Sequence, residues 1–135
     1  MTPDVRGVVA LLGCFDIPTS VAFYRALGFE VVEQWGARDG ELDWVRLRLG
    51  GAELMLNTAY ERGERPPAPD LDRIRGHADT EFFFQCRNVD DVCELLRRNG
   101  LSVGEPETTF YQTKRVLLQD PDGFQIWFQS PVSPS

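Results

Sequence analysis

Few residues of this 135-residue chain have types and spacings that could carry chemistry. The only histidine, His77, stands four residues before Glu81, a spacing that allows a two-ligand metal site. The cysteines Cys14, Cys86 and Cys93 have no metal-type spacing, and an odd number of cysteines is typical of buried, reduced thiols. The sequence has no nucleophile elbow, phosphate-binding loop or dinucleotide-binding glycine pattern. The side chains left for a site are carboxylates, amides, arginines and aromatic rings.

The elements that must position these residues form a repeat with a constant offset of 72 residues. Asp16 and Asn88 each begin a helical pattern, and the apolar stretch 52–56 corresponds to the stretch 124–128. A gap-free offset over so many elements indicates that one βαβββ unit occurs twice. We therefore expect the ligand site between two pseudo-symmetric modules.

The first module is expected to span residues 1–59. Its apolar run 8–14 predicts a strand that is buried on both faces. Asp16 is the expected N-cap of the helix that follows, and Gly28 is its expected end. Three further strands are expected at residues 29–35, 43–49 and 52–57, with a turn at 37–40.

Residues 60–79 are rich in proline and charge, so we expect a linker with at most a short helical turn around 71–74. The second module, residues 80–130, is expected to begin with a strand at 80–87 and a helix capped by Asn88. Its other strands are expected at 101–103, 115–119 and 124–129, with a tight turn at Asp120-Pro121-Asp122-Gly123. The whole chain, residues 1–135, is predicted to be a single domain.

The net charge of −7 disfavours nucleic acid as a partner, because phosphate binding needs clustered lysine and arginine. No apolar stretch approaches the roughly 20 residues of a membrane span. The first residues lack the basic and then apolar layout of a secretory signal. We therefore expect a cytoplasmic protein that does not bind membranes.

Three motifs carry a resemblance to a known superfamily: Asp16-Ile17-Pro18-Thr19-Ser20 with Phe23-Tyr24-Arg25-Ala26-Leu27-Gly28-Phe29, then Asn88-Val89-Asp90, then Asp120-Pro121-Asp122-Gly123. They resemble the vicinal oxygen chelate superfamily, which includes glyoxalase I, extradiol dioxygenases, fosfomycin-resistance enzymes and bleomycin-resistance proteins. The chain length, the Gly50-Gly51 hairpin and the proline-rich linker resemble the bleomycin-resistance branch most. The resemblance implies an α+β fold in which two βαβββ modules form a curled mixed sheet, a cup with helices outside. It also implies a homodimer, often with cups shared between subunits.

Metal-using members of the superfamily carry ligands on the first and fourth strand of each module. Transferred by motif distance, these four positions fall at Val9, Met55, Glu81 and Trp127. Valine and tryptophan offer no lone pair, and a thioether prefers soft metals. Glu81 alone supplies one carboxylate, whereas a catalytic site needs about three protein ligands. We therefore expect no metal cofactor, with a displaced divalent site at His77 and Glu81 as the alternative.

Strand residues alternate between the two faces of a sheet, so the family positions assign the rest of the cup lining. The residues expected to bind the ligand are Trp44, Arg46, Glu53, Met55, Asn57, Glu81, Phe83, Gln85, Gln125, Trp127 and Gln129. Val9, Leu11, Gly13 and Arg48 share this orientation. The opposite set is almost wholly apolar and is expected to pack under the helices. A lining of rings and amides suits a flat, polar, partly aromatic ligand.

The resemblance and the blank metal positions favour a metal-independent protein that binds and sequesters a small, partly aromatic or cationic molecule. Glu81 is the one candidate catalytic residue, since it could form an acid–base pair with Glu53 across the cup. The alternative is a metal-dependent lyase, isomerase or dioxygenase of the glyoxalase type, with ligands drawn from Glu53, Glu81, Gln125 or His77. A third reading is a dimeric interaction module without a ligand. Whether the protein is an enzyme is left open by the sequence.

Overall fold

The computed structural model describes residues 1–36, 41–61 and 63–132, so the predicted turn at 37–40 lies outside the described residues. The first module contains β1 (Ala10–Cys14), α1 (Ile17–Leu27), β2 (Glu30–Gly36), β3 (Leu42–Leu49) and β4 (Ala52–Thr58). The second contains β5 (Glu81–Gln85), α3 (Val89–Arg98), β6 (Glu107–Thr108), β7 (Thr113–Gln119) and β8 (Gln125–Pro131). Between them lie α2 (Leu71–Gly76) and a 3-10 turn, η1 (His77–Asp79). The expected α+β fold of two βαβββ modules is thus present.

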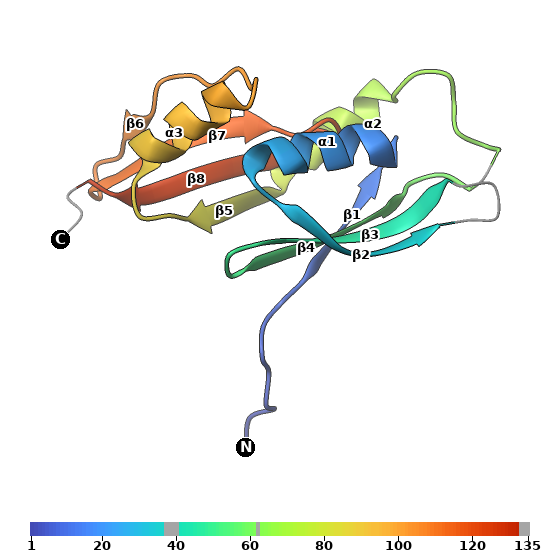
Figure 1. Cartoon of the computed structure of the whole chain (residues 1–135), viewed down its shortest axis with the longest axis horizontal. Coiled ribbons are helices and arrows are strands. Elements are labelled where there is room, and N and C mark those ends of the chain that lie inside the picture. Colours follow the sequence, from blue (N-terminus) through green and yellow to red (C-terminus); the bar gives the residue numbers. More distant parts are fainter. Residues whose placement is uncertain (37–40, 62, 133–135) are drawn as a thin grey trace.

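Each module forms its own four-stranded mixed sheet, in the orders β1-β4-β3-β2 and β5-β8-β7-β6. The pairs β1–β4 and β5–β8 are parallel, and the other pairs in both sheets are antiparallel. Leu12 pairs with Leu56 in one sheet and Phe84 with Phe128 in the other, so strand register keeps the offset of the sequence repeat. Figure 1 shows the two sheets side by side, with α3 lying along the second.

The helix ends follow the predicted capping residues. Asp16 accepts a hydrogen bond from the backbone N–H of Thr19, and Gly28 ends α1 in the left-handed conformation at φ 114°. Asn88 caps α3 by accepting from the N–H groups of Asp90 and Asp91. The two caps are 72 residues apart, as the repeat predicts, and each helix packs against strands of its own module.

The first strand differs from its prediction. Leu12 and Cys14 are buried, but Leu11 is 50% exposed, so the expectation of a strand buried on both faces is wrong. Val8 and Val9 precede the strand and are also exposed. The reason is the layer arrangement: helix α1 packs on one face of the sheet, whereas on the other face Arg73 and Ala59 lie beside Gly13 and Leu11 stays half exposed.

The predicted strand at 101–103 is also wrong. The N–H of Leu101 bonds to the carbonyl of Leu96, which closes the end of α3 instead of pairing with a sheet. The Arg97 guanidinium then holds the carbonyls of Val103 and Gly104. The strand on the side of β7 away from β8 is the two-residue β6, later in the chain. Leu101 and Val103 are apolar because they pack against the core.

One hydrophobic core spans both modules. The Phe29 ring contacts Tyr24 of α1 and Phe84 of β5, both at 5.6 Å between ring centroids and both edge-on. The side-chain amide of Asn99 donates to the carbonyl of Ala26, which ties the end of α3 to α1. The helix-covered faces of the two sheets therefore share one core.

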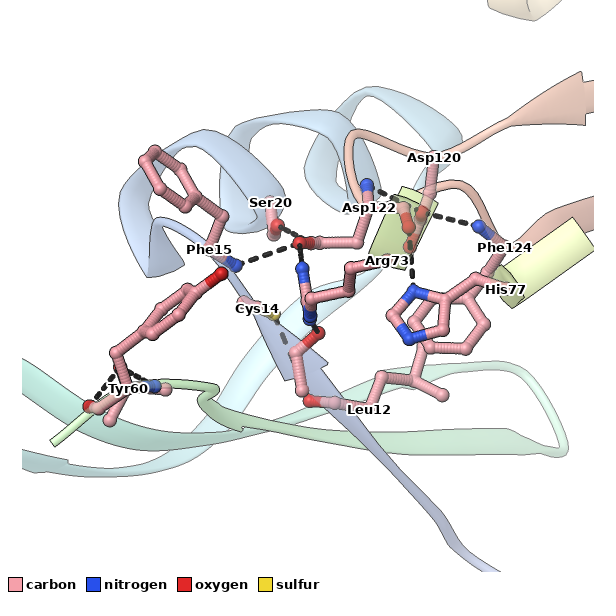
Figure 2. Close-up of polar contacts among 12 residues, drawn as sticks. Leu12, Cys14, Phe15, Ser20, Tyr60, Arg73, His77, Asp120, Asp122 and Phe124 are labelled. Atoms are coloured by element: carbon pink, nitrogen blue, oxygen red, sulfur yellow. Dashed lines mark hydrogen bonds and ion pairs between the residues drawn. The ribbon is translucent and has the colours of Figure 1, made fainter. Parts of the chain in front are cut away.

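A buried polar cluster joins the modules at the turn before β8, and we call Ser20, Tyr24, Arg73, Asp120 and Asp122 the inter-module cluster. Figure 2 labels Ser20, Arg73, Asp120 and Asp122 of this cluster. Asp122 Oδ1 accepts from Arg73 Nη1 at 2.8 Å, and its Oδ2 accepts from Ser20 Oγ at 3.1 Å. Asp120 accepts from the Tyr24 hydroxyl and from two backbone N–H groups of its own turn. The motif predicted only as a turn therefore also connects the halves of the chain.

The linker takes part in this connection. Arg73 of α2 donates to the carbonyl of Gly13 as well as to Asp122. Nδ1 of His77 donates to the Asp122 carbonyl at 2.6 Å, and the imidazole stacks on the Phe124 ring at 4.0 Å. The predicted helical turn around 71–74 is confirmed, and it covers the second module's turn.

The corresponding place in the first module is hollow. The turn at Gly50-Gly51 and its neighbours line an apolar cavity of about 520 Å³ against β5 and α3. Phe83, Phe84 and Leu95 are among the side chains on the opposite wall. The two equivalent junctions of the repeat are thus built differently, one from buried charges and the other around an apolar space.

Candidate functional site

The face of each sheet that lies away from the helices is named here the open face. On β4, Leu54 and Leu56 are buried in the core, whereas Glu53, Met55 and Asn57 alternate with them and are only partly buried. On β8, Ile126 and Phe128 are buried while their neighbours are partly exposed. The open faces therefore carry the polar and aromatic set, and the helix-covered faces carry the apolar set.

The predicted ligand residues divide between two sheets. The open face of the first sheet carries Trp44, Arg46, Glu53, Met55 and Asn57. The open face of the second sheet carries Glu81, Phe83, Gln85, Gln125, Trp127 and Gln129. The structure brings the members of each set together within their sheet, and no hydrogen bond links the two sets in the described part of the chain.

An aromatic stack lies on the open face of the second sheet. The rings of Phe83 and Trp127 are parallel within 3°, with centroids 5.5 Å apart. The guanidinium of Arg115 lies 4.4 Å from the Trp127 ring centroid, a cation–π contact. Trp127 Nε1 donates to Glu81 Oε1 at 2.9 Å, which holds the indole in one orientation. Phe83 remains 40% exposed, so the stack presents aromatic surface to solvent.

Arg115 was missed by the sequence reasoning. Its guanidinium bonds to Glu107 at 2.6 Å and to the Tyr111 hydroxyl at 3.2 Å, and the Glu107 bond raises its pKa. The alternation of β7 contains the signal, because Val116 and Leu118 are buried and Arg115 must face the other way. Arg115 and Glu107 therefore belong to the candidate site.

The open face of the first sheet has a different chemistry. Trp44 pairs across strands with Trp35, which is 70% exposed. Arg48 forms an ion pair of 2.8 Å with Glu53. Arg46 lies between Trp44 and Arg48 on β3. Its Nε is buried and has no hydrogen-bond partner among the described residues. This wall combines aromatic surface with a guanidinium that has no ion-pair partner among the described residues.

The residues at the four metal positions do not fit a divalent cation. Val9 precedes β1, and Met55 lies between Leu11 and Arg46 in the sheet. Trp127 uses its indole N–H to bind Glu81, the only carboxylate of the four. Within the described ranges, no group of three or more His, Cys, Asp and Glu side chains could hold a metal ion.

The alternative pairs of residues are also kept apart. His77 faces Asp122 and Phe124 on the core side, whereas Glu81 lies on the open face beside Trp127. Glu53 and Glu81 belong to different sheets and have different partners, Arg48 and Trp127. The geometry therefore gives no support to a His77–Glu81 metal site or a Glu53–Glu81 acid–base pair.

The cysteines are placed as structural thiols. Cys14 and Cys93 are each 1% exposed, and burial raises the pKa of the Cys14 thiol to about 12. Cys86 is partly buried, and its thiol donates to the carbonyl of Gln129. All three are free thiols.

Comparison with known proteins places this geometry in a family. A family model described as "Glyoxalase/Bleomycin resistance protein/Dioxygenase superfamily" matches residues 8–128. No curated protein sequence matches the chain. In the described residues, no helix is both long enough and apolar enough to cross a membrane.

Several solved structures share the fold at low sequence identity. TioX from Micromonospora sp. ML1 has a TM-score of 0.71 and 17% identity, covering 94% of this chain and 99% of TioX. A bleomycin-binding protein complexed with bleomycin has a TM-score of 0.67 and 17% identity, with coverages of 93% and 98%. TnmS3, an antibiotic-binding protein from Streptomyces sp. CB03234, has a TM-score of 0.66 and 20% identity, with coverages of 96% and 99%. At these sequence identities the likeness shows a shared fold and nothing about ligand or activity.

Proposed function

We propose that this chain, which belongs to the glyoxalase/bleomycin resistance protein/dioxygenase superfamily, binds a small, partly aromatic molecule on its open faces and acts by sequestration. Binding requires no metal in this proposal, because the residues at the four family positions are poor ligands for a hard cation. Two similar folds are those of a bleomycin-binding protein and an antibiotic-binding protein, which supports a binding role.

The observation that carries the proposal is the stack of Arg115, Trp127 and Phe83. Exposed aromatic surface is unfavourable in water unless a partner covers it. Here the rings are parallel, the indole is fixed by Glu81, and Phe83 is 40% exposed. Such a rigid aromatic surface suits a planar ligand, which can stack with little loss of side-chain entropy.

The sequence predicted a partly aromatic or cationic ligand and did not choose between the two. The cationic ligand depended on Glu53 and Glu81, and both carboxylates now have partners in the protein. The aromatic ligand depends on rings that remain accessible on both sheets. The geometry therefore favours the aromatic class.

We also propose that the protein acts as a homodimer. Leu11, Phe83 and Leu117 are 40–50% exposed on the open faces, where no described segment of the same chain covers them. The edges of β1 and β5 have no strand partner within the described residues. A second copy that places its own sheet opposite would cover these side chains and close the cup that the family resemblance implies. A separate proposal concerns localisation: the three free thiols are typical of a reducing compartment, and we propose that the protein is cytoplasmic.

A ligand screen read out through melting temperature and tryptophan fluorescence tests the binding function. Planar aromatic antibiotics and organic cations are added to the purified protein, and melting temperature and tryptophan fluorescence are recorded. A stacking ligand should raise the melting temperature with concentration and quench fluorescence. Trp127→Ala should weaken its affinity about tenfold, while Trp127→Phe keeps a ring and most of the affinity. A panel in which no compound shifts the wild-type melting temperature would contradict the proposal.

A further inference from the structure

We propose that Arg46 binds the acidic group of the ligand, so that the molecule recognised by the first sheet is a planar organic anion such as an aromatic carboxylate. This inference rests on the proposed function, because it assigns a ligand class to the same open faces. It concerns the first sheet alone, so it does not depend on how two copies are arranged.

The first observation is the state of the Arg46 guanidinium. Its Nε is buried and has no hydrogen-bond partner, and the described residues provide no ion pair or hydrogen bond to the rest of the group. Nη1 and Nη2 are not among the buried unpaired atoms, so they reach the surface of the sheet. A guanidinium carries five N–H donors and no acceptor, and leaving its buried donors unpaired is unfavourable. The accessible Nη1 and Nη2 end of the guanidinium is therefore the part that an acceptor from outside the described residues can reach.

The second observation is that the other open-face arginines are already neutralised. Arg48 pairs with Glu53 at 2.8 Å, and Arg115 pairs with Glu107 at 2.6 Å. Arg46 stands on β3 in the same orientation as Arg48, yet it has no such partner among the described residues. Among the described residues, Arg46 is thus an arginine on this open face whose positive charge has no ion-pair partner.

Glu33 is the carboxylate nearest in register. It stands opposite Arg46 on the neighbouring strand β2, where the pairing is interrupted by a bulge. The Glu33 side chain is exposed, and the two groups do not form an ion pair of 4.0 Å or less. An acceptor supplied by a ligand would therefore meet an Arg46 that is not held by Glu33.

The surroundings of Arg46 define the rest of the ligand. Met55 lies beside it on β4, with Leu11 one strand further, so one flank is apolar. Trp44 lies two residues away on the same strand and face, at about 6.6 Å along the strand. A ring stacked on Trp44 can place an attached carboxylate at Arg46 over this distance. The guanidinium fork can accept that carboxylate through two parallel hydrogen bonds.

A matched pair of probes tests the charge preference. 2-Naphthoate and the neutral 2-naphthamide have the same ring, and their affinities are measured by calorimetry. Because hydrogen bonds to a charged group are strong, naphthoate should bind about 10- to 100-fold more tightly than naphthamide. In Arg46→Gln the two affinities should become equal, and in Arg46→Lys part of the preference for naphthoate should remain.

Two control variants define the result. Arg25→Gln removes the same charge from an exposed position on α1 and should leave the ratio unchanged. Glu33→Gln removes a neighbouring negative charge and should leave naphthoate binding equal or tighter. Naphthamide binding equal to naphthoate would overturn the inference while leaving the proposed function intact. A preference that survives Arg46→Gln would overturn it as well.

A spectroscopic arm keeps the inference testable if neither probe binds strongly enough for calorimetry. The Nε–H signal of Arg46 is assigned in ¹⁵N-labelled protein by its loss in Arg46→Lys and is followed during titration with sodium benzoate. A saturable shift of this signal, larger than that of the Arg25 signal, supports anion binding even if the wider antibiotic screen fails. Shifts that are linear or equal at both arginines would overturn the inference.

Discussion

The hydroxyl of Tyr24 in α1 donates a hydrogen bond of 2.6 Å to Oδ2 of Asp120, at the turn before β8. Both residues are buried, so this bond joins the two modules inside the core. Tyr24→Phe leaves a buried carboxylate oxygen without one partner, which costs about 1–3 kcal/mol. We expect the free energy of unfolding, measured by urea denaturation, to fall by that amount.

Tyr60→Phe is the matched control for this variant. Its hydroxyl has no hydrogen bond within the described residues, and Tyr60 is only partly buried. The same chemical change should therefore alter stability by less than about 0.5 kcal/mol. Equal losses in the two variants would show that the Tyr24–Asp120 bond contributes nothing specific.

The pH dependence of stability should reveal Asp120. Burial raises its pKa above the usual 3.8, although bonds from Tyr24 and the turn act in the opposite direction. The folded protein then binds the proton more tightly than the unfolded chain does. Between pH 3.8 and the raised pKa, this group therefore loses stability as pH rises and gains it as pH falls.

The comparison variant is Asp120→Asn, which does not titrate. The difference in unfolding free energy between wild type and variant is measured by urea denaturation at steps from neutral pH downward. Wild type should gain on the variant as pH falls through the raised pKa towards 3.8. A difference that is constant, or that moves against wild type, would contradict the raised pKa.

Gly123 should tolerate no side chain. Its φ is 95°, and a Cβ there would collide with the carbonyl oxygen of Ile74 in α2. Gly50 is also left-handed, at φ 56°, but a Cβ there would meet open space. Gly50→Ala should therefore lower the free energy of unfolding by only the backbone strain, about 1–2 kcal/mol. Gly123→Ala should lower it by more, because the collision adds to the strain. Similar losses in denaturation experiments would mean that α2 moves away at little cost.

The thiols should differ in reactivity in the native protein. Cys14 and Cys93 are each 1% exposed, and the pKa of Cys14 is raised to about 12 by burial. Thiolate formation and access both govern alkylation, so the partly buried Cys86 should react first with iodoacetamide at mildly alkaline pH. Peptide mass spectrometry over time reads the order. Modification of Cys14 at the rate of Cys86 would show that β1 opens readily.

The sequence predicted the local elements well because their signals are local. Asp16 and Asn88 cap their helices as their side-chain chemistry requires. The alternation of Leu54, Met55 and Leu56 correctly assigned the covered and open faces of β4. The strand at 8–14 was predicted with the wrong burial, because apolar composition alone does not say how many layers cover a sheet.

The contacts that the sequence did not reveal join distant residues. Asp122 bonds to Phe15 across 107 positions, and no spacing rule links a turn to a strand end so far away. The contact between Arg115 and Trp127 depends on the register of β7 against β8, which a single sequence does not specify. That Arg46 has no ion-pair partner within residues 1–36, 41–61 and 63–132 likewise cannot be read from its own position in the sequence.

The inter-module cluster has a counterpart position that contains none of its carboxylates. By the repeat offset, Asp122 and Gly123 correspond to Gly50 and Gly51, which border the apolar cavity. If the two modules descend from one duplicated ancestor, their descendants have specialised and are no longer exchangeable. A chain fused from two copies of the first module would lack every carboxylate of the cluster. The two modules therefore keep the same order of strands and helices, whereas the contacts at their two equivalent turns differ.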